Sequence, residues 1–165
     1  MPQELSTHDA IAMVIDNQKS LIGFYSSAAE LAENGTARQV FTRLADETRN
    51  RLAHYCHFHY GKGRFEFDSF MATPMPGGTV MLHELQEQLN PVMNDYQARE
   101  LAMREELDIE KRLKLYADRV LNPVAREILR QAADEMGRHA AIIESEYAHT
   151  MRMVHETDIN TFVRE

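Results

Sequence analysis

Apolar residues spaced three or four positions apart recur over four long segments of this 165-residue chain. Such spacing places apolar side chains on one face of an α-helix, where they can pack against neighbouring helices. It predicts helices at about residues 7–33, 37–60, 91–121 and 123–156. Most of the seven glycines and five prolines gather between these segments. The sequence therefore predicts an all-α fold built from long helices.

The predicted helix ends coincide with residues that cap or break helices. Ser6 or Thr7 can cap the first helix, and Asn34-Gly35 can end it. Asn90-Pro91 and Asn122-Pro123 each join a capping residue to a proline, which fits the first turn of a helix. The connections within the first pair and within the second pair are short. Each pair is therefore expected to form an antiparallel hairpin.

Residues 61–90 break the helical pattern, apart from one short helix expected at about residues 79–89. A connection of about 30 residues is long for a compact domain, so we expect it to cross the length of the bundle. These features predict one domain over residues 1–165, an antiparallel four-helix bundle of the ferritin-like kind. Its one long crossover would join helices 2 and 3. A simple up-down bundle with a decorated loop is the alternative.

An internal repeat relates the two predicted hairpins. Residues 18–24 align with residues 110–116, and residues 44–47 align with residues 132–135. In this alignment, the second hairpin is about one helical turn shorter between the two matches. Two units with a period of about 90 residues indicate duplication of a hairpin rather than a solenoid.

At these residues the chain resembles the rubrerythrin-related branch of the ferritin-like superfamily. Three segments carry the resemblance, residues 18–25, 41–47 and 132–139, and it covers most of the chain outside the crossover and the tail. In that family each hairpin has a carboxylate about six residues before an aromatic residue, and an E-x-x-H motif on its second helix. The resemblance implies a core site in which about four carboxylates and two imidazoles hold two iron or manganese ions.

The sequence departs from that ligand pattern at most positions. Residues that are not family ligands occupy four of the positions: Gln18, Thr48, Arg51 and Met136. Glu110 and His139 match the pattern. A buried guanidinium at Arg51 would repel a pair of metal cations. The resemblance therefore implies a divergent member in which most di-iron ligand positions are substituted.

Two arrangements of these residues are open. The first is a polar network without metal, in which Arg51 pairs with Glu110, and its members are Gln18, Thr48, Arg51, Glu110 and His139. The second is a shifted metal site, and its ligands would be Glu110, His139, Glu135 and Glu106. The simpler interpretation of Gln18 and His139 is that they are core residues satisfied by hydrogen bonds.

His54, Cys56, His57 and His59 cluster near the end of the second predicted helix. His54 and His57 are spaced to share a metal ion, and Cys56 would add a soft donor. The spacing matches no standard zinc module, and the dipole of a helix favours histidine at its C-terminus. We therefore interpret the cluster mainly as a helix end.

The net charge and the composition narrow the range of binding partners and of cellular locations. A formal net charge of −8 argues against nucleic acid and anionic membranes as partners. The single cysteine, Cys56, excludes an internal disulfide and suits a reducing compartment. The start of the chain lacks the pattern of a signal peptide, and no apolar run reaches the roughly 18 residues that a membrane span needs. A cytoplasmic location is expected.

Two classes of function remain at this stage. The residues favour a non-catalytic binding, structural or regulatory module that holds no cofactor and forms a homodimer through helix faces. The family resemblance favours a metal-dependent oxidoreductase that acts on peroxide or oxygen through an altered or mononuclear iron or manganese site. The sequence identifies neither a small-molecule substrate nor a redox partner.

Overall fold

The computed structural model describes residues 4–60, 71–72 and 90–163, with side chains up to residue 149. Four α-helices lie in these ranges: α1 (Thr7–Leu31), α2 (Gly35–Tyr60), α5 (Asp95–Arg119) and α6 (Pro123–Val163). No β-strand occurs in them. The predicted all-α four-helix bundle is confirmed. The predicted crossover falls almost entirely outside the described residues, and so does the short helix at 79–89.

Helix α5 begins later than predicted, because a different asparagine caps it. Asn94, rather than Asn90, is the cap: its side chain accepts a hydrogen bond from the backbone N–H of Gln97 at 2.9 Å. The Gln97 side chain accepts in return from the backbone N–H of Asn94 at 3.0 Å. Ser6 and Asp9 form the same reciprocal pair at the start of α1. Such capping boxes satisfy two amide groups that the helix itself leaves free.

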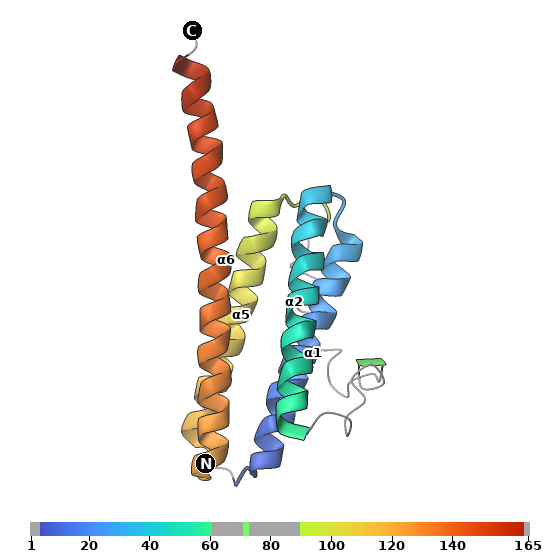
Figure 1. The fold of residues 1–165 in the computed structure, drawn as a ribbon, viewed down its shortest axis with the longest axis vertical. Helices are drawn as coiled ribbons and strands as arrows, with labels where there is room; N and C mark the ends of the chain where they lie inside the picture. The colour runs from blue at the N-terminus through green and yellow to red at the C-terminus, as the bar shows by residue number, and fades with distance from the viewer. Residues whose placement is uncertain (1–3, 61–70, 73–89, 164–165) are drawn as a thin grey trace.

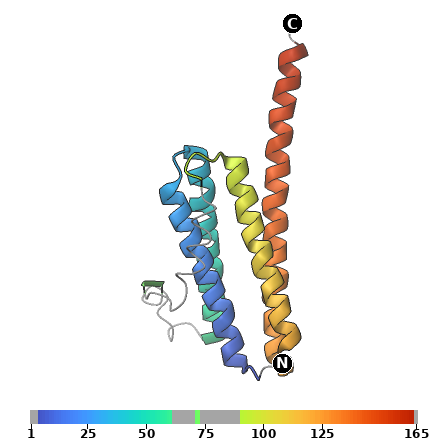
Figure 2. The ribbon, with the colours of Figure 1, turned by 180° about the vertical axis from the view of Figure 1, so that it is seen from behind.

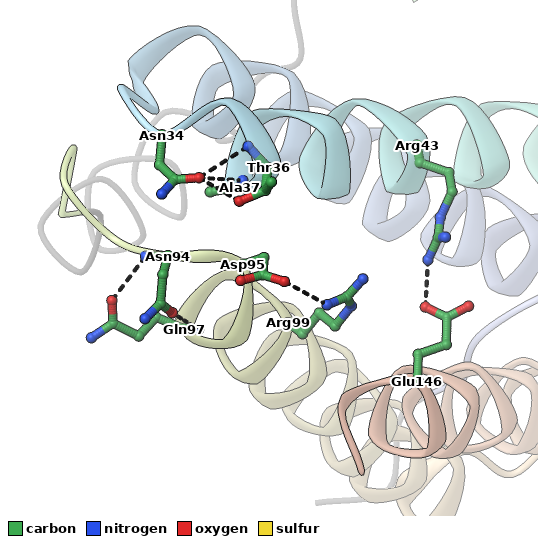
Figure 3. A network of polar contacts seen from close by, with 9 residues as sticks. All are labelled: Asn34, Thr36, Ala37, Arg43, Asn94, Asp95, Gln97, Arg99 and Glu146. Carbon is green, nitrogen blue, oxygen red and sulfur yellow. Dashed lines mark hydrogen bonds and ion pairs between the residues drawn. The ribbon is translucent and has the colours of Figure 1, made fainter. Parts of the chain in front are cut away.

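The two short loops repeat the same hydrogen bonds. In the first loop the side-chain oxygen Oδ1 of Asn34 accepts hydrogen bonds from Thr36 N at 2.9 Å and from Ala37 N at 3.1 Å, as Figure 3 shows. In the second loop Asn122 accepts from Val124 N and Ala125 N at 2.9 and 3.3 Å. These bonds cap α2 and α6.

An arginine completes each loop. The Arg38 guanidinium donates from Nη2 to the carbonyl oxygen of Ala32 at 2.7 Å. Arg126 makes the equivalent bond to Val120 at 2.7 Å. Because each bond joins the first turn of one helix to the end of the preceding helix, it fixes how closely the two helices of a hairpin approach.

One constant offset relates the two hairpins. Helix α5 begins and ends 88 residues after α1 does (Thr7 to Asp95, Leu31 to Arg119), and α6 begins 88 residues after α2 (Gly35 to Pro123). The predicted difference of one helical turn is therefore wrong. The caps and loops keep the same offset, so the second hairpin repeats the first without an insertion or deletion from the cap of its first helix to the start of its second helix.

The two hairpins lie side by side (Figures 1 and 2). In Figure 1, α1 and α6 run upward and α2 and α5 run downward. At the upper end of the bundle, the backbone N–H of Glu33 donates to the carbonyl oxygen of Pro91 at 2.8 Å, which joins the first loop to the second hairpin. Helix α6 continues to Val163, past the predicted end at about residue 156, and extends beyond the other three helices.

The core differs between the hairpins. In the first hairpin Phe24, Tyr25 and Phe41 are fully buried, and their ring centroids lie 5.6–6.4 Å apart. In the second hairpin the large buried side chains are aliphatic: Ile109, Leu113, Leu129 and Met136. Within the described ranges, no helix combines the length and the apolar character that crossing a membrane requires.

Candidate functional site

A carboxylate lies inside the bundle, where the four helices face one another. Glu106 of α5 has none of its surface exposed. The Tyr25 hydroxyl of α1 donates to Glu106 Oε1 at 2.9 Å. The other carboxylate oxygen, Oε2, has no hydrogen-bond partner. Burial raises the pKa of Glu106 to about 7, and the nearby charge of Arg51 opposes this shift.

The position of Glu106 follows from the periodicity of α5. Ala102, Ile109 and Leu113 are buried at positions that share one face of the helix with Glu106. Glu106 therefore lies within the apolar stripe, and packing this stripe against the other helices carries the carboxylate into the core. A carboxylate at such a position is costly unless hydrogen bonds and an opposite charge surround it.

Arg51 of α2 supplies the opposite charge. Its guanidinium is half-buried and donates from Nη2 to the Thr48 hydroxyl at 3.0 Å. Thr48 in turn donates to the carbonyl oxygen of Leu44 at 2.7 Å. Burial lowers the pKa of Arg51, while Glu106 is the largest influence that raises it. The Nε atom of Arg51 is buried and has no hydrogen-bond partner.

His139 of α6 is the third ionisable group at this place. Its Nδ1 atom lies 3.9 Å from Glu106 Oε2, too far for a hydrogen bond, and has no partner of its own. Burial lowers the pKa of His139 to about 4, and the charges of Arg51 and Arg138 act in the same direction. The imidazole is therefore neutral at neutral pH.

Gln18 and Met136 complete the group. The Gln18 side chain of α1 donates from Nε2 to the Met136 sulfur of α6 at 2.9 Å, and its carbonyl oxygen has no partner. We use the name central cluster for Gln18, Thr48, Arg51, Glu106, Met136 and His139. The constant offset of 88 pairs Gln18 with Glu106, Thr48 with Met136, and Arg51 with His139. The cluster thus consists of three equivalent pairs, one member from each hairpin.

Glu110 lies outside the central cluster. The Lys114 ammonium donates to its carboxylate at 2.6 Å, and the side chain is 19% exposed. The predicted pairing of Glu110 with Arg51 does not form, because the carboxylate that the fold places beside Arg51 is Glu106. The sequence alignment had matched Gln18 to Glu110, one helical turn too far along. The repeated pattern Asn-x-x-Ala-Arg, at residues 34–38 and 122–126, is the signal that gives the correct offset.

The other predicted site residues are dispersed. Glu135 is exposed and lies 3.9 Å from Arg138 Nη2 on the surface of α6. Among the residues that the structure describes, no three His, Cys, Asp or Glu side chains gather closely enough to hold a metal ion. The central cluster offers one carboxylate and one imidazole beside a guanidinium. That donor set does not fit a pair of metal ions, which needs several carboxylates to offset its charge.

The histidines near the end of α2 are exposed or partly exposed, whereas Cys56 is buried. Cys56 is fully buried against Ile15, Ile22 and Leu52, and burial raises the pKa of its thiol to about 11. His54 is exposed. His59 lies against the Tyr55 ring, with 4.3 Å between the ring centroids. This arrangement agrees with the interpretation of the cluster as a helix end.

A pocket of about 390 Å³ opens beside the central cluster, between α2 and α6. Its lining includes the polar side chains of Glu106, Arg51 and His139 and the apolar side chains of Leu44, Ile142 and Ile143. Glu47, Asn50 and Glu146 also line it.

An ion pair spans this region between the two helices. Arg43 of α2 pairs with Glu146 of α6, as Figure 3 shows, and lies 3.5 Å from Glu47. Arg43 therefore offsets part of the charge of these two carboxylates, which line the pocket. Its own side chain is about half exposed, so the pair contributes little to stability.

Comparison with protein-family models, with curated proteins and with solved structures found no significant match to this chain. The argument for function therefore starts from the central cluster and the pocket beside it.

Proposed function

We propose that this protein is a non-catalytic binding module, a ferritin-like bundle related to rubrerythrins in which a polar cluster replaces the di-metal centre. The single observation that carries the proposal is the composition of the central cluster. Its six side chains occupy equivalent positions in the two hairpins. On α2 and α6 its members are three residues apart, as in an E-x-x-H motif. Only Glu106 and His139 among them are of the types that hold iron or manganese.

The helix directions support the ferritin-like part of the proposal. Because α2 and α5 run in the same direction, the end of α2 and the start of α5 lie at opposite ends of the bundle (Figure 1). A bundle with one long crossover has this arrangement of helix ends, whereas a simple up-down bundle does not, so the helix directions favour the crossover topology.

The electrostatics support the non-catalytic part. A metal ion beside Glu106 would have to approach the Arg51 guanidinium, which keeps its positive charge at all physiological pH values. Glu106 already accepts a hydrogen bond from Tyr25 and faces Arg51, so its negative charge is partly offset. The pocket beside the cluster gives a binding role a physical location.

Metal loading tests this proposal. Protein purified without chelators and incubated anaerobically with Fe(II) or Mn(II) is expected to retain far less than one metal ion per chain after gel filtration. Its melting temperature should not change, because a ligand that does not bind the native state does not stabilise it. Retention of roughly two metal ions per chain, the content of a di-iron carboxylate protein, would overturn the proposal.

A variant with a restored site provides the positive control. Gln18→Glu, Thr48→Glu, Arg51→His and Met136→Glu together give each hairpin a carboxylate and an E-x-x-H motif around Glu106 and His139. If the bundle is ferritin-like, this variant should bind roughly two metal ions per chain and become more stable in their presence. A folded variant that binds no metal would contradict the ferritin-like assignment.

The second candidate is a metal-dependent oxidoreductase of the rubrerythrin-like group with a mononuclear iron or manganese site. The observation in its favour is that Glu106 Oε2 and His139 Nδ1 lie only 3.9 Å apart and lack partners. It requires one metal ion per chain that is lost in both Glu106→Gln and His139→Gln. It also requires peroxide or oxygen consumption that depends on the metal.

The homodimer expected from the sequence is also part of the proposal. Large apolar side chains are exposed on the outer faces of α5 and α6, namely Leu107, Leu115, Tyr116 and Val124. Sedimentation equilibrium should give about twice the chain mass of 19.0 kDa. A mass of one chain at all concentrations would exclude the dimer.

A further inference from the structure

Three residues that line the pocket each have a buried polar atom without a hydrogen-bond partner. These atoms are Glu106 Oε2, His139 Nδ1 and Arg51 Nε. Buried polar atoms in native proteins nearly always have a partner, because leaving one unsatisfied is costly. All three residues line the same pocket, and Glu106 is completely buried. The structure therefore indicates a place where a ligand atom would satisfy groups that the protein leaves unpaired.

The three atoms define the head group of that ligand. Glu106 Oε2 is an acceptor and Arg51 Nε is a donor, so the head group must both donate and accept. The separation of 3.9 Å between Glu106 Oε2 and His139 Nδ1 is too long for a direct hydrogen bond but leaves both atoms in reach of one ligand atom. A hydroxyl group has one donor and two acceptor lone pairs on a single atom. It meets these requirements with the fewest atoms.

Charge excludes the other simple head groups. An ammonium group could donate to Glu106 but would meet the guanidinium of Arg51. A carboxylate could accept from Arg51 but would meet the carboxylate of Glu106. At the end of the pocket where Glu106 and Arg51 lie, a ligand of either charge gains one attraction and suffers one repulsion. The other two carboxylates in the lining, Glu47 and Glu146, both pair with Arg43. A neutral head group avoids both costs.

The pocket also defines the body of the ligand. The lining includes three large apolar side chains, Leu44, Ile142 and Ile143. Ile142 is 56% exposed, although it is a large apolar side chain, so a ligand would remove its surface from water. A volume of about 390 Å³ lies within the range of small-molecule sites.

We propose that this pocket binds a neutral small molecule that carries a hydroxyl group on a compact apolar body. The inference rests on the proposed function, since it requires a central cluster free of metal. Glu106 accepts a hydrogen bond from the hydroxyl group, Arg51 donates one to the hydroxyl oxygen, and the apolar body covers Leu44, Ile142 and Ile143.

Four probes with the same body and different head groups test this inference. Benzyl alcohol, benzylamine, benzoate and toluene would each be titrated into the metal-free protein at pH 7.5, with the methyl groups of Leu and Ile labelled for NMR. Benzyl alcohol is expected to shift the Leu44, Ile142 and Ile143 methyl signals with a Kd on the order of millimolar, as suits so small a ligand. The other three probes should bind on the order of tenfold more weakly.

A change at Glu106 should alter the order of the probes. Glu106→Gln keeps an oxygen that accepts from Tyr25 but removes the negative charge that repels benzoate. In this variant benzoate, attracted by Arg51, should bind more tightly than benzyl alcohol. Glu110→Gln is the matched control, since it makes the same substitution one helical turn away and outside the pocket. It should leave the order unchanged.

The outcomes separate this inference from the proposed function. Equal binding of benzyl alcohol and toluene, tighter binding of either charged probe by the natural chain, or no binding of any probe overturns the inference. An unchanged order in Glu106→Gln also overturns it. None of these results depends on metal content, which is measured separately and decides the proposed function.

Discussion

The two hairpins share the same helix caps and loop hydrogen bonds, which we call the frame. They differ at the centre of the bundle, in the residues of the central cluster. Helices α1 and α5 have the same length of 25 residues, begin with the same kind of capping box, and lead into loops with matching hydrogen bonds. Yet the central positions carry Gln18, Thr48 and Arg51 in one hairpin and Glu106, Met136 and His139 in the other. The comparison teaches that the frame depends on a few local hydrogen bonds, whereas the centre can vary without changing the frame.

The difference also makes the two halves of the central cluster complementary in charge. The first hairpin supplies the positive charge and the second supplies the negative charge and the imidazole. The Tyr25 hydroxyl of the first hairpin donates to the Glu106 carboxylate of the second. The Gln18 amide of the first hairpin donates to the Met136 sulfur of the second. Two identical halves would place like charges against each other, so the divergence at the centre holds the hairpins together.

The largest predicted effect tests the difference between the aromatic core of the first hairpin and the core of the second hairpin. Phe41 is fully buried against Phe24 and Tyr25, and its equivalent in the second hairpin is the smaller Leu129, which is also fully buried. Phe41→Ala should lower the free energy of unfolding by about 4 kcal/mol and Leu129→Ala by about 3 kcal/mol. Urea denaturation measures both. The exposed neighbour Thr42→Ala should cost no more than about 0.5 kcal/mol. A larger loss for Leu129→Ala would contradict the comparison.

The next prediction tests Glu106, the carboxylate of the central cluster, through the pH dependence of folding stability. Between pH 4.5 and about 7 the folded chain keeps a proton on Glu106 that the unfolded chain releases. The folded state then binds more protons, so its stability falls as pH rises, by up to about 3 kcal/mol. In the natural chain His139 acts in the opposite direction below pH 6.5, since its lowered pKa keeps it neutral when folded. Tyr25, Arg51 and Glu47 also face Glu106.

Glu106→Gln isolates this contribution. Relative to the natural chain, the variant should become progressively more stable as pH rises from 5 to 8. Urea denaturation at each pH gives the difference in unfolding free energy. Glu110→Gln removes a carboxylate from the same helix outside the cluster, and it should show no such trend. A difference independent of pH for Glu106→Gln would show that the carboxylate is not perturbed.

The third prediction tests whether the frame is symmetric. Asn34→Ala and Asn122→Ala each remove a cap at the start of a helix and should each cost about 1 kcal/mol. The two loops lie at opposite ends of the bundle (Figure 1), so the double variant should cost about 2 kcal/mol. Thermal or urea unfolding measures these losses. Single-variant losses that differ by more than about 1 kcal/mol would show that the frame is unequal.

The smallest prediction concerns the helical glycines. A Cβ atom at Gly23 of α1 would meet no atom within 4 Å, so Gly23→Ala should stabilise the chain by up to about 1 kcal/mol. At Gly137 of α6 a Cβ atom would lie 2.9 Å from Glu110 Oε1. Gly137→Ala should therefore stabilise less, because the Glu110 side chain has to move. Melting temperatures compare the two. Adding Glu110→Ala to Gly137→Ala should recover the difference.

The sequence determined the number, type and most ends of the described helices. Apolar periodicity and capping residues act within a few neighbouring positions, so they can be read without knowing the fold. The start of α5 was misjudged, since Asn90-Pro91 and Asn94 are both acceptable caps and only the folded chain shows that Asn94 is used. The repeat was also visible, although its offset was misjudged because the match at residues 18–24 was given more weight than the loops.

The tertiary structure alone decided which polar groups meet. Glu106 and Glu110 lie one turn apart on the same helix, yet one is completely buried against Tyr25 and the other pairs with Lys114 near the surface. That distinction depends on how α5 is rotated against the other three helices, which packing of the whole apolar core fixes. The proximity of Arg51, Glu106 and His139 arises in the same way, since they come from three helices. Local sequence patterns fix each helix, whereas contacts distant in sequence fix the chemistry between them.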